Sequence, residues 1–204
     1  MSRNEDKRVG IADYGVGNLA SLEGALRRLG YKVTMGHKES GFTSVRTLFL
    51  PGVGSFGFAA ENLRQTGLDR FITNRFHARD LPVVGICLGM QLLFEHSEEG
   101  DAAGLGLLEG RVQGFSRRQC HVGWNLVQRP SWVSGDADKS AFYFNHSFRV
   151  TCPRSYVDQT ADYDGEFPAI VSEGLFTGVQ FHPEKSQMSG QLLLRRLVEG
   201  GTDS

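Results

Sequence analysis

A cysteine set between two glycines is the residue of this sequence best suited to chemistry. Cys87 stands in the run Gly85-Ile86-Cys87-Leu88-Gly89, which follows a short apolar segment and leads into an amphipathic one. The pattern is typical of a nucleophile elbow, a sharp turn from strand to helix, with cysteine in place of serine. The glycines permit the turn, and unpaired N–H groups at the helix start favour the thiolate. The sequence therefore predicts that Cys87 is a nucleophile.

The alternative interpretation of a cysteine is a small buried side chain that only packs against apolar neighbours. We apply it to Cys120 and Cys152, because neither has such flanking glycines. The three cysteines are odd in number and widely spaced, which indicates reduced thiols rather than a disulfide framework.

A thiolate that attacks a carbonyl needs an acid and base, and His182 is the best placed of six histidines. It ends the run Gly178-Val179-Gln180-Phe181 and is followed by Pro183 and Glu184. Proline stops a central strand, and residues two apart in an extended chain share a face. Glu184 can then orient the imidazole and stabilise its charged form. The alternative is an ordinary turn histidine beside a solvated carboxylate.

Acyl transfer also requires hydrogen-bond donors for the oxyanion. The N–H group of Leu88, directly after the nucleophile, is one candidate. The second is the N–H group of Val53, in the glycine-rich loop Pro51-Gly52-Val53-Gly54 that follows an expected strand. An ordinary tight turn is the alternative interpretation of that loop.

The elements that must position these residues alternate along the first half of the chain. Four short apolar runs predict strands, and two segments with helical spacing predict helices, the first beginning at Asn18 and ending at Gly30. Such alternation favours a parallel sheet covered on both faces, with reactive residues beyond the carboxyl ends of its strands. The expected strands are residues 9–12, 31–35, 47–50 and 82–86, and the second helix runs from residue 68 to near Asp80.

The second half is richer in strands. Its segments are short and separated by Gly, Asp or Pro, which predicts a mixed or antiparallel extension of the sheet. They are residues 110–115, 124–128, 142–150 and 169–181, followed by a closing helix over residues 191–198. The fold class expected is α/β with a central mixed, mostly parallel sheet, flanking helices and a β-rich C-terminal half. One domain should span residues 1–204, with residues 1–8 as a flexible leader.

Charge and composition exclude several classes of function. Lys and Arg number 22 against 23 Asp and Glu, so no strong field would hold nucleic acid or an anionic membrane. No apolar run approaches a membrane span, and the leader lacks the apolar stretch of a signal peptide, so we expect the cytosol. No second ligand pair accompanies Cys120-His121 at a zinc-like spacing, so no metal is expected.

Two glycine patterns raise the alternative of a dinucleotide cofactor. Residues 15–20 fit G-x-G-x-x-A and residues 52–57 fit G-x-G-x-x-G, each after an expected strand. Only the first has an acid at the required distance, Glu39, and that residue does not close a clear strand. We therefore expect no cofactor.

The motifs together resemble those of the class I glutamine amidotransferases. They occur in the family's order from residue 13 to residue 186, so the resemblance covers nearly the whole chain. It rests on Asp13-Tyr14-Gly15-Val16-Gly17-Asn18-Leu19, Pro51-Gly52-Val53-Gly54, Gly85-Ile86-Cys87-Leu88-Gly89-Met90-Gln91, Gly123-Trp124-Asn125, His146-Ser147 and Gln180-Phe181-His182-Pro183-Glu184-Lys185-Ser186.

The resemblance implies a three-layer amidotransferase-like fold and a Cys87-His182-Glu184 triad that hydrolyses L-glutamine through a thioester. It also implies that Gln91 and the backbone near Gly52 and Ser147 hold the amino-acid end of the substrate.

Within the family, the motifs are most similar to the branch that passes ammonia to a separate (β/α)8-barrel cyclase in histidine biosynthesis, forming a heterodimer. Trp124, Asn125 and Lys185 are the candidates for the contact with that partner.

Two positions depart from the pattern of this branch. Phe148 stands where a tyrosine is usual, and Cys120 where a proline is common. These departures leave open the alternative that the chain is a paralogue that supplies ammonia to another synthase. A stand-alone γ-glutamyl or ester hydrolase, and a scaffold that binds a partner without turnover, are further alternatives.

Overall fold

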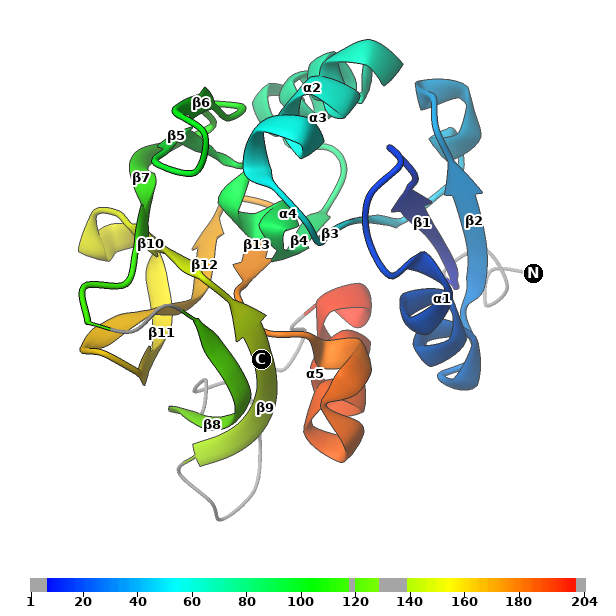
Figure 1. Cartoon of the computed structure of the whole chain (residues 1–204). Coiled ribbons are helices and arrows are strands. Elements are labelled where there is room, and N and C mark those ends of the chain that lie inside the picture. The colour runs from blue at the N-terminus through cyan, green and yellow to red at the C-terminus, as the bar shows by residue number, and fades with distance from the viewer. Residues whose placement is uncertain (1–6, 118–119, 129–138, 201–204) are drawn as a thin grey trace.

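A nine-stranded mixed sheet forms the centre of the molecule (Figure 1). The computed structural model describes residues 7–117, 120–128 and 139–200. In spatial order the strands are β2 (Lys32–Gly36), β1 (Arg8–Ala12), β3 (Thr47–Gly52), β4 (Val83–Cys87), β13 (Phe176–Val179), β12 (Glu166–Glu173), β11 (Val157–Asp162), β8 (His121–Gln128) and β9 (Lys139–His146).

The parallel and antiparallel halves of this sheet meet at β13. Strands β2, β1, β3, β4 and β13 pair in parallel, whereas β12, β11, β8 and β9 continue the sheet antiparallel. The carboxyl ends of β3, β4 and β13 therefore meet at one edge, with Gly52 opposite Cys87 and Val179 opposite Ile86. This edge is where the sequence predicts the reactive residues.

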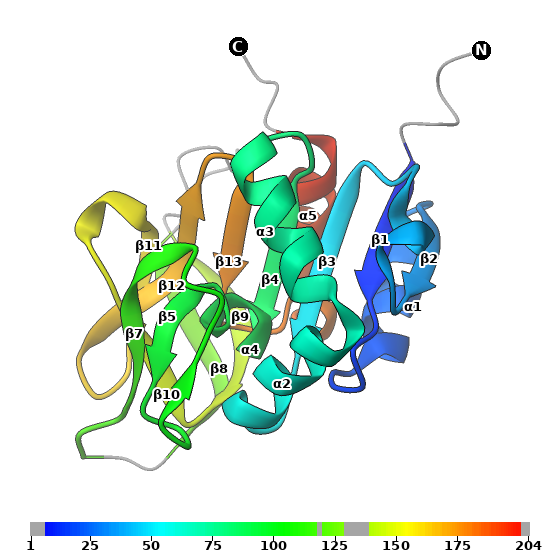
Figure 2. The same cartoon turned by 90° about the horizontal axis from the view of Figure 1, so that it is seen from above.

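Helices cover both faces of the sheet (Figure 2). Helices α1 (Leu19–Arg28) and α5 (Gln187–Glu199) lie on one face, and α2 (Phe56–Thr66) and α3 (Leu68–Ala78) lie on the other. Each pair buries an apolar side against the sheet, so the core consists of two hydrophobic clusters separated by the strands. The predicted mixed sheet with flanking helices is thus confirmed.

A second, four-stranded sheet packs beside α2. It contains, in spatial order, β10 (Phe148–Thr151), β7 (Leu108–Gly114), β5 (Phe94–Ser97) and β6 (Ala102–Ala103). The expected strand over residues 142–150 is therefore two strands in different sheets, broken at Ser147. This break places Asn145, His146 and Ser147 between the two sheets.

The amphipathic stretch after Cys87 differs from the expected helix. Helix α4 covers only Leu88–Gln91, and β5 begins at Phe94. Leu92, Leu93 and Phe94 are all buried, so the segment has no exposed helical face that would extend α4. Helix α2 was not predicted from the sequence. Three short 3₁₀ turns complete the elements of the described residues: η1 (Glu39–Phe42), η2 (Arg154–Tyr156) and η3 (Pro183–Lys185).

Strand β1 begins at Arg8, the last residue of the expected leader, and residues 1–6 lie outside the described residues. Asn18 occupies the N-cap position of α1, although its side chain makes no capping hydrogen bond to the described residues. Among those residues, no helix combines the length and apolar character needed to cross a membrane.

Candidate active site

Cys87 lies at the tip of a strained turn between β4 and α4. Its φ of 55° and ψ of −109° are unfavourable for a residue with a side chain, a strain of about 1–3 kcal/mol. Close packing leaves room only for glycine at positions 85 and 89, on either side of Cys87. A Cβ on Gly85 would lie 2.7 Å from the Gly89 oxygen, and one on Gly89 would overlap the Leu50 carbonyl group. The predicted elbow geometry is present.

The thiol of Cys87 is held between β9 and the end of β13. Its Sγ lies 3.8 Å from the Asn145 carbonyl oxygen and 3.7 Å from Nε2 of Gln180. Gln180 is fully buried and follows β13, the parallel neighbour of β4. Sheet pairing therefore brings the segment that contains His182 to the nucleophile.

His182 and Glu184 form a buried pair at the same edge. Nδ1 of His182 lies 2.8 Å from Oε1 of Glu184, and both side chains are less than 5% exposed. The contact is the predicted one, but its geometry differs: Pro183–Lys185 forms the 3₁₀ turn η3 rather than extended chain. The backbone N–H of His182 donates to the Tyr143 carbonyl oxygen at 2.8 Å, which fixes this segment to β9.

The His182 imidazole favours its charged form. Burial alone would lower its pKa, but the Cys87 and Glu184 side chains outweigh burial and raise the pKa to about 10. The second ring nitrogen, Nε2, is buried and makes no hydrogen bond of ordinary geometry within the described part of the chain. The arrangement leaves Nε2 free to exchange a proton with the sulfur or with a substrate.

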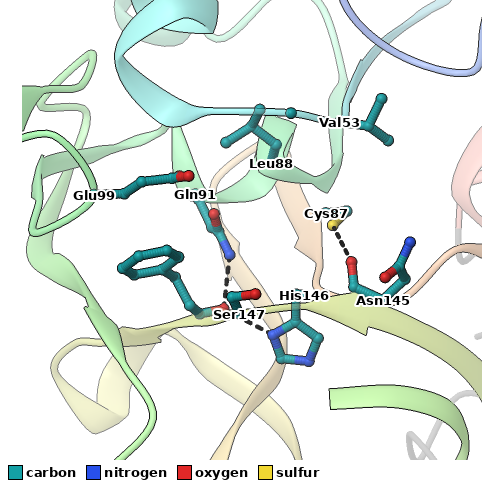
Figure 3. A pocket seen from close by; sticks show the side chains of 10 residues that line it. Val53, Cys87, Leu88, Gln91, Glu99, Asn145, His146 and Ser147 are labelled. Carbon is teal, nitrogen blue, oxygen red and sulfur yellow. Dashed lines mark hydrogen bonds between the residues drawn. The ribbon is translucent and has the colours of Figure 1, made fainter. Parts of the chain in front are cut away.

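The end of β3, which extends through Pro51 and Gly52 of the expected loop, packs tightly over the start of α4. Tyr14 donates a hydrogen bond to the Pro51 carbonyl oxygen at 2.6 Å, and a Cβ on Gly52 would lie 2.9 Å from the Gly89 nitrogen. Only glycine permits this approach of two backbones. Val53 and Leu88, the predicted oxyanion donors, consequently line one cavity (Figure 3).

That cavity has a volume of about 210 Å³ and contains the nucleophile. The predicted substrate-binding residues Gln91 and Ser147 line it, whereas Gly52 packs behind it and is not among its lining residues. His182 does not line it either and is buried. The structure therefore brings the nucleophile, both oxyanion candidates and two of three substrate candidates to one cavity.

Glu99 is a cavity residue that the sequence analysis did not identify. Its carboxylate points toward Gln91 in Figure 3, and Oε2 accepts the N–H of Phe56 at 2.9 Å, at the start of α2. The sequence shows only an acidic pair, Glu98-Glu99, in a polar segment. Nothing local distinguishes it, because only the packing of the second sheet against α2 turns Glu99 inward.

The three partner candidates do not all face outward. Trp124 is half exposed on β8 and contacts the ring of Tyr143 edge-on, and Nζ of Lys185 lies 5.9 Å from the centre of that ring. Val122 and Leu126 are also exposed on β8, so these side chains form a continuous apolar surface. Asn125 instead turns inward, and its Nδ2 donates to the Asp162 carbonyl oxygen at 2.9 Å.

Comparison with known proteins adds independent evidence. Residues 11–198 match the family model described as glutamine amidotransferase class-I. A relative from Staphylococcus aureus (strain bovine RF122 / ET3-1), imidazole glycerol phosphate synthase subunit HisH, is 37% identical over 94% of this chain and 96% of its own. The protein of that name from Shouchella clausii (strain KSM-K16) is 42% identical over 94% of this chain and 99% of its own.

Solved structures show the same fold at lower identity. A glutamine amidotransferase crystal structure has a TM-score of 0.76 and 20% identity, and covers 94% of this chain and 98% of its own. The structure of PurLQS from Thermotoga maritima has a TM-score of 0.77 and 18% identity, with 94% and 97% covered.

Proposed function

Because the chain belongs to the class I glutamine amidotransferase family, we propose that it hydrolyses L-glutamine as the glutaminase subunit of an imidazole glycerol phosphate synthase. The observation that carries the proposal is the strained Cys87 elbow beside the buried His182–Glu184 pair. A nucleophile, an acid–base group and an orienting carboxylate are the parts that acyl transfer requires. The names of the relatives support the particular synthase.

The proposed reaction proceeds in two steps. Thiolate Cys87 attacks the side-chain amide carbon of glutamine, and the N–H groups of Leu88 and Val53 stabilise the oxyanion. Protonated His182 then gives its Nε2 proton to the leaving nitrogen, which departs as ammonia and leaves a glutamyl thioester. The neutral imidazole next takes a proton from water, the hydroxyl attacks the thioester, and glutamate leaves as the thiolate re-forms.

The cavity supports recognition of a free amino acid. Glu99 is the acidic side chain among the lining residues, so it is suited to the substrate ammonium group. Gln91 uses both amide hydrogens on the protein, donating to the carbonyl oxygen of Phe148 at 2.9 Å and to Oε1 of Gln180 at 3.0 Å. Its Oε1 is left as an acceptor, and backbone near Gly52 and Ser147 would receive the carboxylate.

Released ammonia would be protonated and diluted in bulk water, which favours direct delivery to a partner. We propose a (β/α)8-barrel cyclase as that partner, in a cytosolic heterodimer. The apolar β8 surface with Trp124 and Lys185 is the proposed docking face, because large apolar surface and aromatic anchors are typical of interfaces. Asn125 would contribute to docking only indirectly, because its side chain turns away from that surface and binds the Asp162 carbonyl oxygen.

The test is a glutaminase and synthase assay of the chain with and without the cyclase from the same organism. We expect glutamine-dependent formation of imidazole glycerol phosphate only with both chains. Full glutaminase activity of the isolated chain and no effect of the cyclase would instead indicate a stand-alone γ-glutamyl hydrolase. Activation by a different synthase would indicate a paralogue.

Replacing Glu184 with glutamine should reduce kcat/KM by roughly 10- to 100-fold, because Glu184 orients His182 rather than reacting. Its carboxylate contributes to the raised pKa of His182, so the variant should lose the protonated imidazole at lower pH than the native protein, in which that pKa is about 10. The measurement is the alkaline limb of the kcat/KM profile, which we expect to move to lower pH. An unmoved limb would contradict the role.

The same pair links pH to stability. A pKa raised in the folded state contributes stability that is complete below the unfolded value of 6.5 and is lost as pH rises through about 10. In the Glu184→Gln variant this loss should also begin near pH 6.5 but should be smaller and complete at lower pH, which denaturant titrations between pH 7 and 10 would measure.

Replacing Glu99 with glutamine should raise KM for glutamine by roughly 10- to 100-fold with a smaller change in kcat, since it removes a charged acceptor for the substrate ammonium group. Glutamine retains an oxygen that can accept the Phe56 N–H, so α2 should remain capped. The matched control is Glu98→Gln, because Glu98 accepts the N–H of Gly114 outside the cavity. Equal KM values for the two variants would contradict the assignment.

A further inference from the structure

Two buried histidines next to the cavity form a contact that the proposed chemistry does not use. Nδ1 of His121 lies 3.0 Å from Nε2 of His146, and His146 lines the cavity beside Ser147. Both are less than 7% exposed. The ring of His121 stacks on Tyr163 and on Phe144, at centroid distances of 4.0 and 4.6 Å, so its orientation is fixed by packing.

The hydrogen-bond partners determine where the protons lie. Nδ1 of His146 is 2.7 Å from the Phe148 carbonyl oxygen, which can only accept, so Nδ1 carries the hydrogen. In the neutral ring Nε2 then accepts, and Nδ1 of His121 must donate to it. His121 Nε2 is consequently an acceptor for Nδ2 of Asn125, 3.3 Å away.

Asn125 has the matching orientation. Its Oδ1 accepts the Leu126 N–H at 2.7 Å, and its Nδ2 also donates to the Asp162 carbonyl oxygen. The donors therefore run in one direction, from β8 through both histidines to Phe148. Burial above all, helped by nearby basic side chains, lowers the pKa of His146 to about 3, which is consistent with the neutral ring that this order requires.

The chain of hydrogen bonds ends on the substrate side. The Phe148 carbonyl oxygen accepts hydrogen bonds from both His146 and Gln91. A rotation of the Gln91 amide by 180° would place its oxygen against that carbonyl oxygen and against Oε1 of Gln180, where it would be repelled. The orientation of the Gln91 amide thus depends on where the Phe148 carbonyl group is held.

We propose that His146, held by His121, is a positioning residue for glutamine binding: it fixes the Phe148 carbonyl group so that Gln91 presents its amide oxygen to the substrate. The inference rests on the proposed function and names two residues that act on the substrate only through others. Together with Glu99, the Gln91 oxygen provides hydrogen-bond acceptors on one side of the cavity. These acceptors select a ligand with an ammonium group.

The test compares His146→Leu with His146→Asn in the complex with the cyclase. We expect His146→Leu to raise KM for glutamine roughly 10- to 100-fold, because it leaves a buried acceptor without one of its donors, with a smaller effect on kcat. His146→Asn keeps a donor and should fall between the native protein and His146→Leu. The packing control is Phe167→Leu, since Phe167 contacts both imidazole rings without polar atoms.

Unchanged KM in His146→Leu, or an equal rise in Phe167→Leu, would overturn the positioning role. Nitrogen-15 NMR of the native chain provides a measurement that does not depend on activity or on folding of the variants. Both rings should carry the hydrogen on Nδ1, and a hydrogen on Nε2 of either ring would overturn the proposal. Absence of glutamine hydrolysis by the native complex would contradict the proposed function itself. This result is distinct from the KM and NMR results that would contradict only the positioning role.

Discussion

Replacing Cys87 with alanine is expected to reduce glutamine hydrolysis by about 10⁴-fold or more, since loss of the nucleophile removes the covalent route altogether. The elbow should survive, because alanine retains the Cβ and the glycines on both sides are unchanged. Mass spectrometry after incubation with a glutamine analogue that carries an electrophilic ketone should find label on Cys87 in the native protein. The variant should carry none at that position.

The matched control for this prediction is Cys152→Ala. Cys152 is half-buried, and burial raises the pKa of its thiol to about 11, so it remains protonated and unreactive at neutral pH. We expect that variant to turn over glutamine at the native rate. Substantial turnover by Cys87→Ala would contradict the thioester mechanism at Cys87. Label on a different cysteine of the native protein would identify that cysteine as the nucleophile instead.

Replacing His182 with alanine should lower kcat/KM by roughly 10²- to 10⁴-fold, the usual effect of losing a positioned acid–base group. Two steps are affected, because the leaving nitrogen must gain a proton and the attacking water must lose one. The native protein keeps this imidazole protonated up to about pH 10, so the acid is already charged when glutamine binds. Steady-state glutaminase assays with the cyclase present would measure the loss.

His96→Ala is the control for a histidine paired with a carboxylate. Nε2 of His96 lies 2.9 Å from Oδ1 of Asp101, but the side chain is 45% exposed and does not line the cavity with Cys87. This variant should retain native kinetics. If His182→Ala kept turnover within about fivefold of native, another group would have to serve as the acid and base.

Local sequence predicted those parts of the site that depend on a few adjacent residues. The glycines on both sides of Cys87 permit a sharp turn with close backbone packing, so the elbow can be predicted from adjacent residues alone. Pro183 likewise lacks the backbone N–H group that would extend a sheet ladder, and the two residues beside it are close by chain connectivity. The contact between His182 and Glu184 was predictable for this reason, even though the turn is 3₁₀.

Hydrophobic periodicity was less informative for segments that are buried on all sides. The stretch after Cys87 has helical spacing, but its side chains are buried on all sides, and the helix ends at Gln91. Where a polar side chain such as Gln91 is buried together with its apolar neighbours, the pattern does not distinguish a helix from another buried segment. The break at Ser147, which divides the expected strand over residues 142–150 between two sheets, was likewise not marked by the pattern.

The groups that could react were identifiable from the amino-acid sequence: a thiol on an elbow, and an imidazole with its carboxylate. Their meeting depends on the folded sheet, because β13 inserts beside β4 and strand order is not encoded in local patterns. The same is true of the cavity, which Glu99 and His146 both line, and of the contact between His146 and His121. Their neighbours in space come from strands far apart in the chain, and no spacing along the sequence records those contacts.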